Sequence, residues 1–185
     1  LARLYCSREA FQTAYYHLRD YVQPWVEQGC VLDPSLRARF YLRMAEITPD
    51  IGRLAETVPY ARHALAIYQE TNDLRGQYFT LVRIASTLLH LAQYSEAATA
   101  IAQAKACLAV GDFGTLERAR VYNLESHYHW HRGQLQEAVA VAQCYLTLAD
   151  QEATSNFRAY ARILLANLYR DLGQFATATA WYAAT

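Results

Sequence analysis

A short turn-like segment recurs along this chain at a nearly constant spacing. Its four copies place Gly52, Ala92, Gly133 and Gly173 in register, so the period is 40 or 41 residues. A fixed period of this size is typical of helical-repeat proteins, in which each repeat buries its apolar face against its neighbours. The spacing therefore predicts an all-α chain built from stacked helix pairs.

Each repeat divides into two amphipathic helices around the recurring turn. Before Gly173, apolar residues recur at intervals of three and four, as on one buried helix stripe. They are Ala161, Leu164, Leu165, Leu168, Tyr169 and Leu172. The residue five positions after each turn is small, and the four are Thr57, Ala97, Ala138 and Ala178. Small residues at a fixed position predict a close contact between the two helices of each pair.

The chain is predicted to form a single domain, which the turns divide into five segments. They are a partial repeat over 1–32 and repeats over about 33–73, 74–114, 115–154 and 155–185. The partial repeat is predicted to supply a second helix from Ala10 to Trp25. The chain begins without Met and stops within a helix pattern, so we expect it to be a fragment of a longer protein.

Proline and aspartate predict several helix ends. Asp33 and Pro34 form an N-cap followed by a first-turn proline. Pro49 should end or kink a helix around Thr48, because it lacks a backbone donor and restricts the residue before it. Pro59 is expected close to the start of the next helix, where the missing donor costs less.

Charge and cysteine content exclude several classes of function. Seventeen basic residues balance seventeen acidic ones, so no global field draws the chain to nucleic acid or an anionic membrane. The cysteines, which are Cys6, Cys30, Cys107 and Cys144, form no C-x-x-C pair and are expected to be free thiols in a reducing cytoplasm. No apolar run approaches the roughly 20 residues of a spanning helix. We therefore expect a cytoplasmic protein without direct nucleic-acid or membrane binding.

The repeats resemble the tetratricopeptide repeat (TPR). In the last repeat the residues that match the consensus are Leu165, Ala166, Tyr169, Leu172, Gly173, Phe175, Ala178 and Tyr182, and Leu135, Ala138 and the stretch 60–65 match other parts of it. The usual TPR period is about 34 residues. The longer period here resembles the repeat domains of bacterial maltose-activator-type transcription regulators. The resemblance implies a right-handed superhelical solenoid of antiparallel helix pairs.

The same resemblance implies a binding surface on the first helix of each repeat, which lines the inside of the superhelix. The expected ligand-binding residues are Arg39, Arg43, Arg83, Arg120, Asn123, His127, Trp130, Tyr160 and Asn167. Arginine forks can hold carboxylates or phosphates, and aromatic rings can hold flat apolar groups. The alternative is that these side chains only solvate an exposed face.

The segment His127–His131 contains three histidines, and two predictions concern the helix that carries it. His127 and His131 are one helical turn apart and could form half of a metal site, but no spacing identifies further ligands. We therefore predict no metal and no cofactor. On the same helix, Glu125 and His129 are four residues apart and are predicted to form a structural hydrogen-bonded pair.

The sequence lacks the common catalytic motifs, including the phosphate-binding G-x-x-x-x-G-K-[ST] loop, H-E-x-x-H and G-x-S-x-G. We therefore predict a non-catalytic scaffold that binds a protein or peptide, as the sensor or assembly region of a larger bacterial regulator. One alternative is a small-molecule effector domain of a transcription regulator, which the maltose-activator resemblance implies. The other is a self-association module that forms a homodimer.

Overall fold

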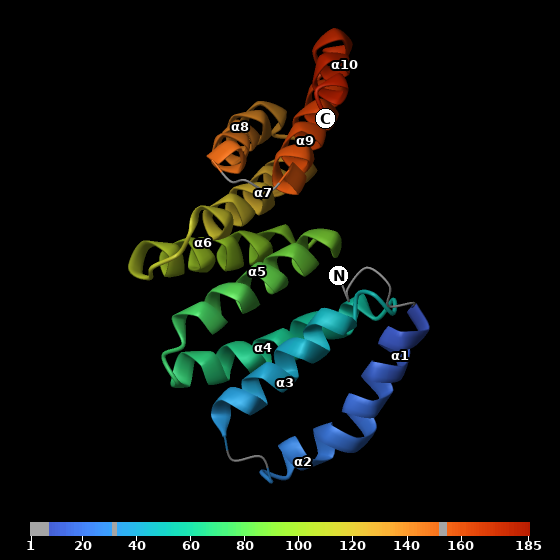
Figure 1. Cartoon of the computed structure of the whole chain (residues 1–185), viewed down its shortest axis with the longest axis vertical. Coiled ribbons are helices and arrows are strands. Elements are labelled where there is room, and N and C mark those ends of the chain that lie inside the picture. The colour runs from blue at the N-terminus through green and yellow to red at the C-terminus, as the bar shows by residue number, and fades with distance from the viewer. Residues whose placement is uncertain (1–7, 31–32, 152–154) are drawn as a thin grey trace. The chain divides into compact units, whose positions relative to one another are not determined.

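The structure is a computed structural model that describes residues 8–30, 33–151 and 155–185. Every regular element in these ranges is helical, as the all-α prediction requires (Figure 1). The elements are α1 (Arg8–His17), the π-helical turn η2 (Leu18–Val22), α2 (Gln23–Glu27), α3 (Pro34–Ile47), α4 (Leu54–Glu70), α5 (Leu74–His90), α6 (Tyr94–Val110), α7 (Thr115–His131), α8 (Leu135–Gln151), α9 (Ser155–Asp171) and α10 (Phe175–Ala183). Cys6 lies outside the described residues; Cys30, Cys107 and Cys144 are free.

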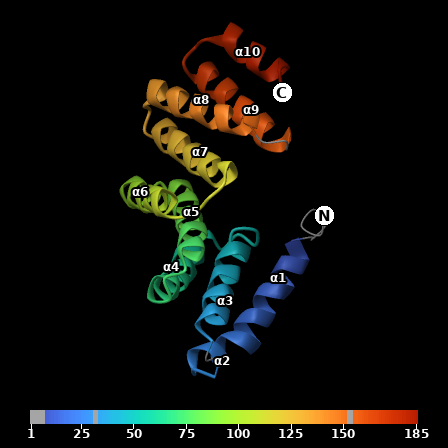
Figure 2. The same ribbon diagram turned by 60° about the vertical axis from the view of Figure 1, so that its left-hand side comes forward.

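Consecutive helices pack as hairpins. α3 packs against α4, α7 packs against α6 and α8, and α9 packs against α8 and α10 (Figures 1 and 2). The chain forms two compact units, Leu1–Thr87 and Leu88–Thr185, whose boundary falls inside α5. Each unit is described by itself below.

The recurring turn is a left-handed helix cap. Gly52, Ala92, Gly133 and Gly173 all have positive φ, between 57° and 81°. In the turn at Gly133, the Gly133 N–H donates to Trp130 O at 2.9 Å and the Gln134 N–H donates to His129 O at 3.0 Å. The same pair of bonds closes the other three turns. They satisfy carbonyls at the end of the first helix and reverse the chain into the second.

Ala92 is the one member of this set with a side chain, which leads to a stability prediction. A residue with a Cβ at φ 57° is strained by about 1 kcal/mol or more. Glycine removes this strain, but it also makes the unfolded state more flexible, and this offsets part of the gain in stability. We expect Ala92→Gly to stabilise the chain by about 0.5 kcal/mol in urea unfolding. Gly133→Ala is the matched control and should destabilise, since its φ is 74° and nothing lies within 4 Å of an added Cβ. A loss of stability in Ala92→Gly would contradict the strain argument.

The first unit begins with one helical run from Arg8 to Glu27 rather than the regular helix predicted over 10–25. The run contains a π-helical turn directly before Pro24, where the Gln23 N–H donates to Leu18 O. A proline ring clashes with the carbonyl four residues earlier, and a wider turn relieves such crowding.

A buried tyrosine ties this helical run to α4. Tyr15 is 1% exposed, and its hydroxyl donates to Glu56 Oε2 at 2.6 Å. Arg53 donates to the other oxygen of Glu56 at 2.7 Å and also lies over the Tyr15 ring at 5.1 Å. These hydrogen bonds, opposed by burial, hold the pKa of Glu56 below its usual range. Tyr15 also belongs to the apolar core of this unit together with Val26, Phe40, Met44, Ile47 and Ile51.

The helix ends around α3 and α4 follow the predictions with one correction. Asp33 caps α3 by accepting the Ser35 N–H at 2.8 Å, and α3 ends at Ile47 before Pro49. Pro59, however, lies inside α4, beyond its first turn. Its ring and Ala55 are both exposed, so water can hydrate the carbonyl that loses its partner.

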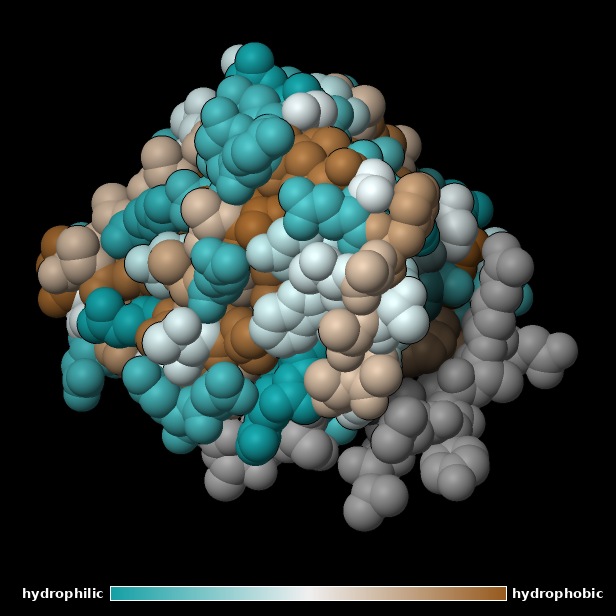
Figure 3. Space-filling model, turned by 90° about the horizontal axis from the view of Figure 1, so that it is seen from above, coloured by the Kyte–Doolittle hydropathy of each residue, from teal (hydrophilic) through white to brown (hydrophobic). Residues whose placement is uncertain are grey.

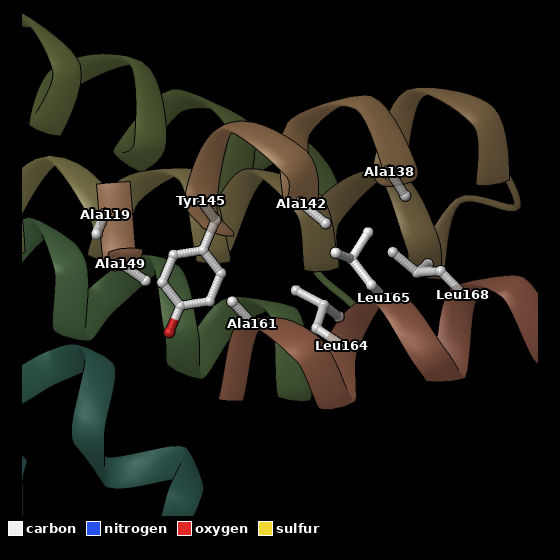
Figure 4. Packing of buried hydrophobic residues seen from close by; sticks show 9 residues of the cluster. All are labelled: Ala119, Ala138, Ala142, Tyr145, Ala149, Ala161, Leu164, Leu165 and Leu168. Atoms are coloured by element: carbon white, nitrogen blue, oxygen red, sulfur yellow. The ribbon is translucent and has the colours of Figure 1, made fainter. Parts of the chain in front are cut away.

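The second unit is held together by small and aliphatic residues between α7, α8 and α9. The buried set, shown in Figure 4, is Ala119, Ala138, Ala142, Tyr145, Ala149, Ala161, Leu164, Leu165 and Leu168. Because alanine adds little volume, the helix axes can approach closely while the leucines fill the remaining space. The small residues predicted after each turn are all buried: Thr57, Ala97, Ala138 and Ala178. In the first unit Thr57 is tolerated because its hydroxyl pairs with that of Thr48 at 2.8 Å.

The surface is mixed in character. The face in Figure 3 shows hydrophobic residues exposed between hydrophilic ones. Within the described ranges, no helix is long and apolar enough to cross a membrane.

Candidate functional site

α7 and α9 lie side by side and run in the same direction. Near their starts, the Arg120 guanidinium lies 5.9 Å from the centre of the Phe157 ring. Near their ends, the Trp130 indole N–H donates to Asp171 Oδ2 at 2.8 Å, across 41 residues of sequence. That separation equals the repeat period, so the bond joins corresponding ends of consecutive repeats. We call the surface made by these two helices the α7–α9 face.

Four rings gather at the carboxyl-terminal end of α7. His127 stacks with Trp130 at 5.6 Å and with His131 at 6.2 Å between ring centres. Tyr94, from the start of α6, stacks on His131 at 6.1 Å. Stacked rings with polar edges form a flat, largely apolar surface that still offers hydrogen-bonding groups. We call Tyr94, His127, Trp130 and His131 the ring cluster.

The electrostatics of the ring cluster keep His127 neutral. Burial lowers its pKa to about 4, and the nearby His131 and His90 add smaller effects in the same direction. At neutral pH its imidazole therefore offers one hydrogen-bond donor and one acceptor but no positive charge. Among the described residues, no group of three His, Cys, Asp or Glu side chains is placed to hold a metal ion.

A polar network continues from the ring cluster along α9. Arg170 donates to Asp171 Oδ1 from Nε at 2.9 Å, and this bond, together with the one from Trp130, lowers the pKa of Asp171. The Asn167 side-chain oxygen accepts from the Tyr182 hydroxyl at 2.6 Å and from Arg170 at 3.4 Å. Because these two bonds occupy the oxygen, Asn167 could contact a ligand only by donating its amide hydrogens.

The predicted ligand-binding residues fall into two groups. The second unit carries six of them, which are Arg120, Asn123, His127, Trp130, Tyr160 and Asn167, all on α7 or α9. Tyr160 is 64% exposed. The first unit carries Arg39, Arg43 and Arg83. Arg39 and Arg43 line a pocket of about 500 Å³ on α3, and Arg83 lies on α5. That these residues bind a ligand stays a prediction.

Two members of the site come from second helices, which the sequence-based prediction did not include. Tyr94 lies on α6 and Tyr182 on α10, and both contact the first-helix residues named above. The sequence-based prediction assigned binding positions only to residues that precede each turn. It therefore missed residues on the helix that follows the turn. The repeat period could have indicated the contact between Trp130 and Asp171, because these residues are one repeat apart.

The predicted pairing of Glu125 with His129 is wrong. Glu125 accepts instead from Lys105 of α6 at 2.6 Å. The His129 ring nitrogen Nδ1 pairs with Gln134 Oε1 at 3.0 Å, in the turn that follows α7. A full positive charge on the neighbouring helix is a stronger partner for a carboxylate than a neutral imidazole on the same helix.

No protein-family model matches the chain, and no curated protein matches its sequence. Solved structures do resemble it. BtubC (BKLC) from P. vanneervenii is 17% identical, with a TM-score of 0.78 over 94% of this chain and 71% of that one. A putative kinesin light chain of Podosopora anserina with nearly identical TPR-like repeats is 21% identical, with a TM-score of 0.77 over 99% and 88%.

The Rap protein complexed with competence and sporulation factor is 20% identical, with a TM-score of 0.80 over 96% of this chain. The chain spans 48% of the length of that protein. At such identities the likenesses establish the fold alone. The chain therefore has a TPR-like helical-repeat fold, as its sequence predicts.

Proposed function

We propose that the chain is a non-catalytic scaffold that binds an extended segment of a partner protein across the α7–α9 face. The observation that carries the proposal is the Trp130–Asp171 hydrogen bond, 2.8 Å long, which ties one ring of the ring cluster to α9. A binding surface that is already ordered loses little conformational entropy when it binds. Binding of Rap to competence and sporulation factor supports a recognition role for this fold.

The chemistry of the face indicates which segment would bind. The ring cluster suits an aromatic or proline side chain, since flat apolar groups stack on indole and imidazole rings. Asn167 can pair with a backbone amide. Arg120, which is exposed, can hold a carboxylate through its guanidinium fork. The preferred ligand is therefore an extended peptide with an aromatic or proline residue and an acidic residue.

Random-peptide display on the purified chain tests this function. We expect enrichment of peptides with an acidic residue and an aromatic or proline residue, and about tenfold weaker binding to Trp130→Ala or Arg120→Ala. Gln103→Ala, on an exposed position of α6, is the matched control and should bind as the wild type does. Circular dichroism should show that all three variants remain helical. Enriched peptides whose affinity is the same for every variant would place the site elsewhere.

We further propose that this scaffold is the sensor or assembly region of a larger bacterial regulator, with both units acting in a single repeat domain. A small-molecule effector is the second candidate ligand, and the stacked rings favour it because they can hold a sugar or nucleobase. Native mass spectrometry distinguishes the two. A retained small adduct that Trp130→Ala loses would support the effector over the peptide.

A further inference from the structure

A buried tyrosine of α8 extends toward the α7–α9 face. Tyr145 is 2% exposed. Its ring packs with Ala119 of α7, Ala149 of α8 and Ala161 of α9 in the core of the second unit. Figure 4 shows the ring beside Ala161, with the hydroxyl at the end that points away from α8. Small side chains on three helices therefore leave room for an aromatic ring among them.

The Tyr145 hydroxyl lies near two side chains of the α7–α9 face. Burial is the main cause that raises the pKa of Tyr145 to about 12, Tyr160 adds to the rise, and Arg120 opposes it. Electrostatic effects of this kind weaken with distance and are screened by solvent, so the hydroxyl lies close to both groups. Arg120 directly follows Ala119, and Tyr160 directly precedes Ala161. The hydroxyl therefore emerges between α7 and α9, level with Arg120 and Tyr160.

These three polar groups lack partners of their own within the described ranges. There, neither the Tyr145 nor the Tyr160 hydroxyl forms a hydrogen bond, and no carboxylate forms an ion pair with Arg120. Arg120 lies instead 5.9 Å from the centre of the Phe157 ring, which orients its guanidinium without neutralising it. The Tyr145 oxygen is not one of the fully buried polar atoms without a partner in this part of the chain. It is therefore open to solvent at the face and can meet a ligand.

The chemistry of these groups selects an anion. All three can donate hydrogen bonds, and Arg120 carries a positive charge. Tyr160 is 64% exposed, and among the described residues no carboxylate acts on the Tyr145 hydroxyl. A planar guanidinium can hold both oxygens of a carboxylate, while a phenol donates to one of them.

We propose that Arg120, Tyr145 and Tyr160 form a carboxylate-binding site on the α7–α9 face. Arg120 pairs with the carboxylate, and the two phenols donate hydrogen bonds to its oxygens. Because core packing holds the Tyr145 ring, its hydroxyl adds specificity for an acceptor at one fixed position. The proposal rests on the proposed function, since the carboxylate is that of the acidic residue in the bound segment.

The distance from this site to the ring cluster predicts a spacing in the ligand. Arg120 and Trp130 are ten residues apart on α7, which corresponds to about 15 Å along a helix. An extended segment advances about 3.3 Å per residue. A segment that follows α7 would therefore carry its acidic residue about four or five positions from its aromatic or proline residue.

Small aromatic compounds test the site without a peptide. Benzoate and benzamide have the same ring, but only benzoate presents a carboxylate. NMR titration of the ¹⁵N-labelled whole chain at constant ionic strength measures the affinity for each probe, with the Arg120 Nε–H signal as the reporter. Benzoate should bind at least about tenfold more tightly than benzamide, because the guanidinium pairs with its charge.

Four variants assign the contributions. Tyr145→Phe keeps the buried ring and should weaken benzoate binding about tenfold, whereas benzamide should change much less, because a hydrogen bond to a neutral acceptor is weaker. Arg120→Gln should remove the preference for benzoate. Arg118→Gln is the matched control, since Arg118 is also exposed on α7 but two residues away it faces another side. Trp130→Ala should bind benzoate as the wild type does.

Two results would overturn the proposal. One is equal affinity of the wild-type chain for benzoate and benzamide. The other is a preference for benzoate that Tyr145→Phe leaves unchanged. Displayed peptides that depend on Trp130 but need no acidic residue would remove this site and leave the scaffold function standing. Benzoate binding without any enriched peptide would do the reverse, so the two failures are distinguishable.

Discussion

Replacing Gly76 with alanine should destabilise the chain by about 2 kcal/mol, although alanine is the better helix former. Gly76 is buried in the first turn of α5. A Cβ built on it would lie 2.3 Å to 2.5 Å from ring atoms of Tyr68, at the end of α4. Real carbon atoms do not approach so closely, so the ring or the helix would have to move.

The surroundings of Tyr68 prevent an easy retreat of its ring. The ring is 5% exposed, and the Tyr68 carbonyl accepts both the Asp73 N–H at 2.9 Å and the Gln77 side-chain amide at 3.0 Å. The Gly76 N–H donates to Asp73 Oδ1 at 2.9 Å. These bonds hold the start of α5 against the end of α4, so overpacking outweighs the propensity gain of about 1 kcal/mol.

A double-mutant cycle measured by urea unfolding tests the contact. With Tyr68→Ala in the background, the space is free, and Gly76→Ala should become neutral or stabilising. Ala102→Gly, at an exposed position in the interior of α6, reports helix propensity alone and should cost about 1 kcal/mol. A stabilising Gly76→Ala in the otherwise wild-type chain would show that the Tyr68 ring is not held in place.

The second large effect is acid destabilisation through His127. Its pKa is about 4 in the folded chain and near 6.5 in an unfolded one. Between these values the unfolded state binds more protons, so stability falls as the pH drops from about 6.5 to about 4. Below about pH 4 both states are protonated and His127 contributes no further loss. The whole interval amounts to about 3 kcal/mol.

Comparing stability against pH in wild type and His127→Gln isolates this contribution. Asp171 and the other carboxylates destabilise both proteins alike in acid, so the difference in slope between pH 7 and pH 4 belongs to His127. Gln103→Ala, at an exposed position of α6, changes no titratable group and is the control that should follow the wild-type curve. Identical slopes in wild type and His127→Gln, or an NMR titration of His127 near pH 6.5, would contradict its burial in the ring cluster.

The helix pairs, their turns and most of their ends could be predicted from local sequence. These features depend on local interactions: the left-handed cap at Gly133, the Asp33 N-cap and the missing donor of Pro49 act within a few residues. The residue at each close helix contact was also predictable, because only a small side chain fits there. Pro59 shows the limit of local reasoning, since exposure to water lets α4 continue around it.

Which side chains meet across helices depends on how the helices pack in three dimensions. The same α7 sequence would allow Glu125 to pair with His129, but the position of α6 brings Lys105 to it instead. The bond from Trp130 to Asp171 and the pocket beside α3 likewise depend on how neighbouring helices stack. Periodicity predicts which face of a helix a residue occupies. Which side chain it contacts on a neighbouring helix depends on distances of a few ångströms, and these are set by the packing of the helices.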